Sequence, residues 1–195
     1  MRYWIMIVCI ALASTPLASG QQSGTDKTAQ GVLGQTIESK ETGIKFFVPR
    51  GIALYSADNP GPLRSRISTE TPYFLVNPDF KDENVNIKIA DGVTESDLRG
   101  MKDMLDSNPN TPLPGYKRIE VKFVKIGKGG TIEALEHRYE MKGNVSGRMR
   151  SITFVIGNRG FIVTCGTAVE RFESANKDFF EPFLASIEPV KQQRQ

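Results

Sequence analysis

Apolar and polar residues alternate with a period of two along residues 118–123 and 135–141. Glycine-containing turns at 127–130 and 143–147 separate these segments from each other and from the one that follows. That third segment, residues 149–168, places two runs rich in Val, Ile, Phe and Thr around Gly157-Asn158-Arg159-Gly160. Strand side chains alternate between two faces, and short turns join antiparallel neighbours. The pattern predicts an antiparallel meander that ends in a central β-hairpin.

Residues 94–107 change to the period of a helix. Leu98, Met101 and Leu105 recur at helical spacing, while charged residues occupy the other faces. Thr94 followed by Asp97 predicts a capping box at the start of this helix. The prolines and glycine of residues 109–115 end it.

A second helical stripe closes the chain between residues 170 and 187. Its apolar positions are Phe172, Phe179, Phe183 and Ile187. Proline lacks the backbone N–H that a helix needs, so Pro182 should kink or divide this element.

Short strands are predicted earlier in the chain, at residues 45–48, 52–55, 72–76 and 85–89, with turn-forming segments between them. Together with the meander and the helices they indicate one α+β domain over residues 35–190, built on an antiparallel β-sheet flanked by helices. Residues 21–34 are rich in Gln, Gly, Ser and Thr and are typical of a flexible leader. We expect the polar residues 191–195 to fray.

Residues 1–20 have the pattern of a cleaved signal peptide. Arg2 is the only charge, residues 3–13 are almost wholly apolar, and Ala18-Ser19-Gly20 supplies small residues at the cleavage positions. A membrane anchor is the alternative, but a bilayer core needs roughly 20 apolar residues. We therefore expect an exported protein, periplasmic or extracellular, with no later membrane span.

Removing that segment leaves 24 basic and 22 acidic residues, a net charge of +2. Nucleic-acid-binding domains concentrate basic residues on one face, so this balance indicates no nucleic-acid partner. Cys165 becomes the only cysteine, and no internal disulfide can form. The fold must then depend on its hydrophobic core.

His137 and Cys165 are the residues best suited to catalysis. The strand register places His137 beside Leu135 and Tyr139, which favours a partly buried structural role. Cys165 is expected to face inward as a small apolar residue, with a reactive thiol as the alternative. One His and one Cys cannot form the usual tetrahedral zinc site, and no Gly-x-Ser-x-Gly elbow is present.

Two loops have the composition of ligand sites. Gly127-Lys128-Gly129-Gly130-Thr131 superficially resembles a phosphate loop, but a strand follows it, which favours a hairpin turn. Asp79, Asp82 and Glu83 could hold calcium. They lack the spacing of an EF-hand loop, so solvated acids are the favoured interpretation.

Other surface motifs lie in predicted turns and on the predicted sheet. Residues 109–114 contain a P-x-x-P arrangement that is best explained as a stiff connector, and Asn144-Val145-Ser146 is a glycosylation sequon. Several basic residues could gather on part of the sheet, but interleaved Glu120, Glu136 and Glu140 indicate a mixed, solvated face. These basic residues are Arg118, Lys122, Arg138, Lys142, Arg148 and Arg150.

The order of elements, together with Phe46-Phe47-Val48-Pro49-Arg50-Gly51, the hairpin and the closing Phe183-Leu184-Ala185-Ser186-Ile187, resembles the PsbP-like fold group over roughly residues 40–190. This group includes the extrinsic photosystem subunit, the Ran-binding nuclear import factor of yeast and the DcrB-like bacterial envelope proteins. The resemblance implies an α/β/α sandwich and a non-catalytic role in larger assemblies. Export argues against nuclear import, so the DcrB-like branch fits best.

These observations lead us to expect an exported, non-catalytic binding or accessory protein of the bacterial cell envelope. It should be a monomer without metal or cofactor, and its partner should be an envelope protein or a membrane complex. The alternatives are an extrinsic subunit of a membrane complex and a hydrolase without a recognisable motif. No catalytic, cofactor-binding or metal-binding residue is predicted, and the binding residues stay open.

Overall fold

The computed structural model describes residues 34–108, 114–143 and 146–190. The expected signal peptide (1–20), leader (21–34, apart from Gly34) and tail (191–195) lie outside the described residues. So do residues 109–113 of the proline-rich segment and Asn144 of the sequon. Within the described residues, no helix is both long enough and apolar enough to cross a membrane.

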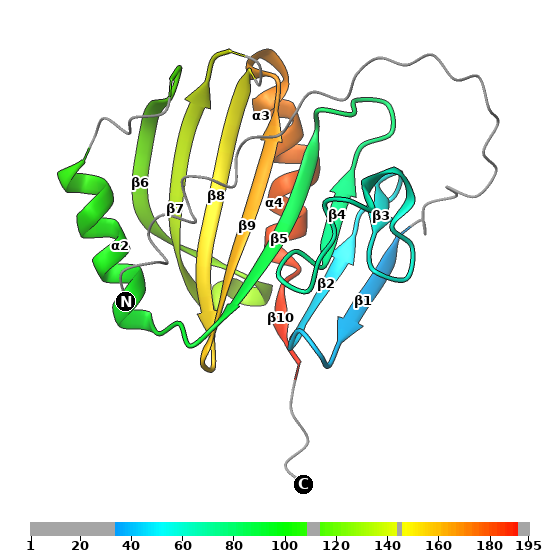
Figure 1. Ribbon diagram of the computed structural model, residues 1–195, viewed down its shortest axis with the longest axis horizontal. Coiled ribbons are helices and arrows are strands. Elements are labelled where there is room, and N and C mark those ends of the chain that lie inside the picture. Colours follow the sequence, from blue (N-terminus) through cyan, green and yellow to red (C-terminus); the bar gives the residue numbers. More distant parts are fainter. Residues whose placement is uncertain (1–33, 109–113, 144–145, 191–195) are drawn as a thin grey trace, which may run out of the picture.

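A seven-stranded antiparallel sheet forms the centre of the fold (Figure 1). Its spatial order is β3-β4-β5-β9-β8-β7-β6. The strands are β3 (Ala53–Tyr55), β4 (Tyr73–Val76), β5 (Asn84–Asp91), β6 (Lys117–Ile126), β7 (Ile132–Met141), β8 (Gly147–Ile156) and β9 (Arg159–Thr167). The predicted meander and its central hairpin are confirmed, because β6 to β9 are consecutive neighbours.

The hairpin turn is shorter than the four residues expected for it. Ile156 pairs with Arg159, so only Gly157 and Asn158 form the turn, and Arg159 and Gly160 belong to β9. Gly157 has φ of +66°, which a residue with a side chain rarely adopts. A glycine at the first position of a two-residue turn matches the twist of the flanking strands. Arg159 therefore points from a strand instead of lying in a loop.

The helix predicted for residues 94–107 is confirmed as α2 (Glu95–Ser107), with its capping box. The Thr94 N–H donates to the Asp97 carboxylate at 2.8 Å. Met101 and Leu105 pack on Leu135 of β7, together with partly buried side chains of β6. We call the side of the sheet covered by α2 the α2 face.

The opposite side of the sheet, which we call the C-terminal face, carries the main core. The C-terminal helical region covers it in four parts, which are η3 (Val169–Arg171), α3 (Phe172–Ala175), the π-helical turn η4 (Asn176–Phe180) and α4 (Glu181–Ala185). All four residues of the predicted stripe are buried there. The expected division at Pro182 is confirmed. The π-helical turn ends at Phe180, and α4 begins at Glu181 with Pro182 as its second residue.

A second sheet, absent from our expectations, lies beside the C-terminal helices. It consists of β1 (Gln35–Ser39), β2 (Ile44–Val48) and β10 (Glu188–Pro189), in the order β1-β2-β10. Ile44, Phe46 and Val48 of β2 point into the main core and are fully buried. The expected α/β/α arrangement is thus correct. On the C-terminal face, the helices and this three-stranded sheet together cover the seven-stranded sheet.

Candidate functional site

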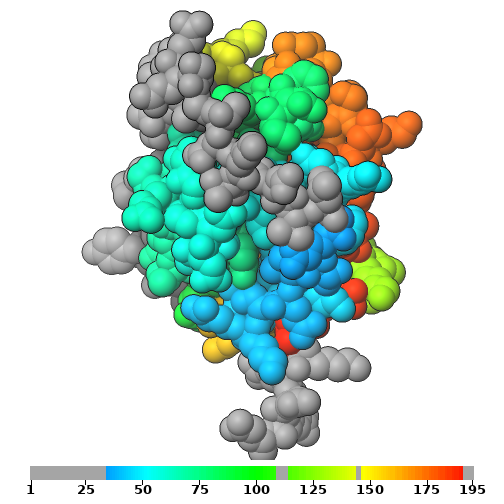
Figure 2. Space-filling view, turned by 90° about the vertical axis from the view of Figure 1, so that its right-hand side faces the viewer, coloured from blue at the N-terminus to red at the C-terminus, as the bar shows by residue number. Residues whose placement is uncertain are grey.

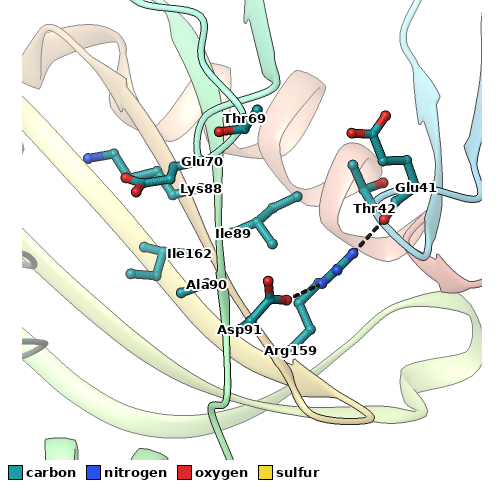
Figure 3. A pocket seen from close by; sticks show the side chains of 10 residues that line it. All are labelled: Glu41, Thr42, Thr69, Glu70, Lys88, Ile89, Ala90, Asp91, Arg159 and Ile162. Carbon is teal, nitrogen blue, oxygen red and sulfur yellow. Dashed lines mark hydrogen bonds and ion pairs between the residues drawn. The ribbon is translucent and has the colours of Figure 1, made fainter. Parts of the chain in front are cut away.

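A groove of about 410 Å³ opens where the two sheets meet, between the β1–β2 turn and β5. Figure 3 shows the side chains around it, and Figure 2 shows the blue β1–β2 hairpin beside the turquoise segment that leads to β4. We call it the edge groove. Its lining residues come from four segments and are Glu41, Thr42, Thr69, Glu70, Lys88, Ile89, Ala90, Asp91, Arg159 and Ile162.

The groove lies at the edge of β5 and not on one face of the sheet. Successive strand residues point to opposite faces, yet the consecutive residues 88–91 all line the groove. Lys88 and Ala90 lie opposite Ile162 and Gly160 of β9, whereas Ile89 and Asp91 lie opposite Phe161 and Arg159. A cavity that touches both sets of side chains must wrap around the strand edge.

Arg159 joins the two sheets beside this edge. Its Nε donates to Asp91 Oδ1 at 2.7 Å, and its guanidinium also donates to the backbone carbonyl of Glu41 in the β1–β2 turn (Figure 3). A charge-assisted hydrogen bond is stronger than one between neutral groups. Arg159 therefore fixes the position of the turn, and its charge is balanced by Asp91.

The remaining charges of the groove are Lys88, Glu41 and Glu70. Partial burial lowers the pKa of Lys88, and the nearby negative charge of Glu70 opposes that shift. Glu41 and Glu70 are exposed, and neither forms an ion pair with a described residue. The open part of the groove thus has one cation and two carboxylates, together with the apolar side chains of Ile89, Ala90 and Ile162.

His137 lies away from the groove, on the α2 face of β7. The ring contacts Tyr139 at a centroid distance of 4.7 Å, and His137 Nε2 shares a 2.7 Å hydrogen bond with the Tyr116 hydroxyl. Burial lowers the pKa of His137 to about 4, and the charge of Arg118 adds to this shift. The expected structural role is confirmed, because a ring packed and bonded in this way is neutral at physiological pH.

Cys165 points into the core from the C-terminal face of β9 and is fully buried. Desolvation raises the pKa of its thiol to about 12. The thiolate is the nucleophilic form of cysteine. The expected inward orientation is confirmed, and the reactive-thiol alternative is wrong for the folded protein.

The acids proposed as a calcium alternative bind other parts of the protein. Asp82 accepts a hydrogen bond from the Ala168 N–H at 2.9 Å and forms an ion pair with Arg171. Glu83 is buried and accepts from the Asn77 amide at 2.9 Å. The Asp82 contacts attach the loop before β5 to the start of the C-terminal helical region, and the Glu83 bond closes the loop on itself. The favoured interpretation as solvated acids is therefore wrong for Glu83, which is buried, whereas Asp82 is exposed and forms an ion pair.

The glycine-rich loop at residues 127–131 is a hairpin turn, as predicted. It connects β6 to β7, and no helix of the length needed to cradle a phosphate follows it. Its backbone is already bonded, since the Gly127 N–H donates to Leu184 O at 3.0 Å and the Lys128 N–H to Ile187 O at 3.2 Å. The loop therefore serves to cap the end of α4.

The basic residues of β7 and β8 are interleaved with acids, as predicted, but the Glu136–Arg150 pair is not solvated. Glu136 is 1% exposed and Arg150 is 7% exposed, and their side chains lie 2.6 Å apart under the C-terminal helices. Arg150 also donates to Asn176 Oδ1 at 2.8 Å. The expectation of a solvated face is wrong here, because η4 covers these side chains.

Sequence reasoning missed the edge groove entirely. Glu41, Glu70 and Lys88 belong to no motif, and Arg159 was assigned to a turn. The one available signal was that Lys88 interrupts the apolar side chains of a strand between Ile87 and Ile89. That signal does not distinguish a groove from ordinary solvent exposure.

Comparison with known proteins defines the fold. No family model matches the chain, and no curated protein matches it. Among solved structures, the chain is similar to cyanobacterial PsbP (CyanoP) from Synechocystis sp., with 16% identity and a TM-score of 0.54, over 88% of this chain and 99% of that one. A Bacteroides thetaiotaomicron protein is also 16% identical, with a TM-score of 0.53 over 82% of this chain and 49% of that one. The chain has a PsbP-like fold.

Proposed function

We propose that this protein is an exported, non-catalytic accessory protein of the bacterial cell envelope, in the DcrB-like branch of the PsbP-like group. The observation that carries the proposal is the PsbP-like fold, which aligns with 99% of the length of CyanoP. An accessory protein acts by presenting a rigid surface to a partner. We assign this role to the edge groove, which lies where the two sheets meet.

The N-terminal segment supports the export part of the proposal. Residues 1–20 combine one basic residue, an apolar stretch and small residues before the expected cleavage point. Free Cys165 is buried, and its raised pKa protects it from oxidation in an oxidising compartment. The domain is thereby suited to a compartment in which exposed thiols would cross-link.

The chemistry of the groove favours binding over hydrolysis. Glycosidase-type and related acid–base reactions use two carboxylates placed in a site that excludes water. Here Asp91 is paired with Arg159, and Glu41 and Glu70 lie in solvent at the rim. Cys165 is buried in the core, and the partly buried His137 is hydrogen-bonded to Tyr116 on the α2 face, away from the groove.

Cell fractionation tests this proposal. The full gene, with a C-terminal epitope tag, is expressed in a bacterial host, and osmotic shock separates periplasm from cytoplasm. We expect a processed chain in the periplasm whose N-terminal sequence begins near Gln21, with a part on membranes that salt removes, because weak surface association is electrostatic. An unprocessed chain confined to the cytoplasm would refute the export part of the proposal.

A further inference from the structure

The edge of β5 is open where it borders the groove. Strand β4 pairs with β5 only from Asn84 to Ile87. Beyond that point one backbone bond continues the ladder, from the Ile89 N–H to the Glu70 carbonyl at 2.8 Å. From Ile89 to Asp91, no described strand lies along this edge.

Several backbone groups of this stretch point away from β9, toward the side on which the groove residues Thr69 and Glu70 lie. In a strand, the N–H and C=O of one residue point to the same side, and those of the next residue to the other. Since the Ile89 N–H points away from β9, the carbonyl of Ile89 and the N–H and carbonyl of Asp91 point away from β9 as well. The Ile89 N–H is bonded to Glu70, whereas the other three groups have no backbone partner among the described residues, and unpaired groups of this kind are a template for another strand.

The side chains around the edge select the charge of what can bind. The Arg159–Asp91 pair is neutral as a whole and is held by the Glu41 carbonyl. Lys88 and Glu70 carry opposite charges and lie near enough to each other to interact. Glu41 is left as the uncompensated charge at the rim, so a cationic side chain fits and an anionic one is repelled.

We propose that the edge groove binds a short extended peptide segment that carries a basic side chain, and that this segment pairs with the open edge of β5 between Ile89 and Asp91. The inference rests on the proposed accessory function, since it gives the chemistry of the partner. Each strand residue advances about 3.3 Å, so the open edge accommodates about three residues of peptide. The groove volume, about 410 Å³, is at the small end of the range for ligand sites.

Recognition would then divide between backbone and side chain. Hydrogen bonds along the β5 edge bind the peptide main chain, as in other strand-addition complexes. Ile89, Ala90 and Ile162 contact its apolar atoms, and the basic side chain lies against Glu41. The short length of the open edge also protects the fold from pairing with long strands.

The test uses the processed, uniformly ¹⁵N-labelled protein and the pentapeptide Val-Thr-Lys-Val-Thr, acetylated and amidated at its ends, followed by amide NMR spectra. Two matched peptides serve as controls, Val-Thr-Glu-Val-Thr and the lysine peptide with N-methylated backbone amides. We expect saturable shifts at residues 88–92 with the lysine peptide. The glutamate peptide should bind at least about fivefold more weakly, since an ion pair is lost and a repulsion gained. The N-methylated peptide should not bind.

Substitutions at Asp91 separate the backbone contribution from the side chain. Asp91→Pro removes the N–H on the groove side but no backbone bond to β9. It should weaken binding of the lysine peptide by at least about fivefold. Asp91→Ala removes the same carboxylate but keeps that N–H, so the proline variant should bind the lysine peptide at least about fivefold more weakly than the alanine variant. Glu41→Gln, at an exposed position, should lower the preference for lysine over glutamate by about two- to fivefold.

The outcomes distinguish this inference from the proposed function. Shifts spread over the surface, or equal binding of the lysine and glutamate peptides, would overturn the groove proposal. So would equal effects of Asp91→Pro and Asp91→Ala while both variants give folded spectra. A periplasmic protein with an unresponsive groove would leave the accessory function standing, whereas an unprocessed cytoplasmic chain would refute that function whatever the groove binds.

Discussion

Replacing Arg150 with methionine should destabilise the fold by about 3 kcal/mol. Glu136 Oε1 lies 2.6 Å from Arg150 Nε and 2.6 Å from Arg138 Nε, and Glu136 is 1% exposed. Arg150→Met leaves this buried carboxylate with one cation and also removes the donor to Asn176 Oδ1. Breaking a buried pair costs about 3–5 kcal/mol, and the remaining Arg138 contact places the loss near the lower limit.

Urea and thermal unfolding followed by far-UV circular dichroism measure this loss. A domain of this size loses about 2–4 °C in Tm for each kcal/mol, so the variant should melt about 6–12 °C lower. The control is Lys102→Met, which breaks an exposed Lys102–Asp106 pair on α2 and should cost less than about 0.5 kcal/mol.

The companion variant Glu136→Leu/Arg150→Met removes both buried charges. It should recover most of the stability, because an apolar pair avoids the desolvation cost of the ions. If Arg150→Met stays within about 0.5 kcal/mol of the unchanged protein, the network does not hold η4 on the sheet, and the reasoning fails.

Three further predictions concern His137, Thr94 and Cys165. His137 has an ordinary pKa of 6.5 and a folded pKa of about 4, so below pH 6.5 the unfolded chain takes up a proton that the folded chain does not. The free energy of unfolding should therefore fall by up to about 3 kcal/mol by pH 4. Urea titrations should show that His137→Phe reduces this acid sensitivity. Thr94→Ala removes the capping-box hydroxyl and should cost about 1 kcal/mol in the same assay, whereas Thr94→Ser should cost far less. Cys165 should not react with a thiol reagent at pH 8 in the folded protein and should react fully in denaturant; rapid native labelling would contradict its burial.

The sequence predicted the elements whose signal is local. Leu98, Met101 and Leu105 repeat within one helix, and the hairpin around Gly157 needs only its own turn. The class of fold followed from the order of such elements. Each of these features depends on residues that are close along the chain.

The missed features depend on residues that are far apart along the chain. Strand β10 has two residues, and it exists because β2 offers an edge more than a hundred positions earlier. Arg159 bonds to Asp91, 68 positions away, and to Glu41, 118 positions away. The edge groove arises from these contacts, so periodicity and composition could not locate it.

The sequence also did not predict which charged side chains are buried. Glu136 and Arg150 occupy positions of an alternating pattern that is typical of a solvated face. The π-helical turn η4 brings Asn176 and the adjacent phenylalanines over that face. A helix predicted from its stripe alone does not show which part of the sheet it covers.

Site-specific photo-cross-linking in living cells tests the central claim most directly. A benzophenone amino acid is placed at Thr69, on the rim of the edge groove, and in a matched strain at Arg99, an exposed position of α2. If the protein is an accessory protein that binds its partner through the groove, illumination produces a discrete adduct of higher mass from Thr69 and not from Arg99. No adduct from Thr69, or the same adducts from both positions, would contradict the claim.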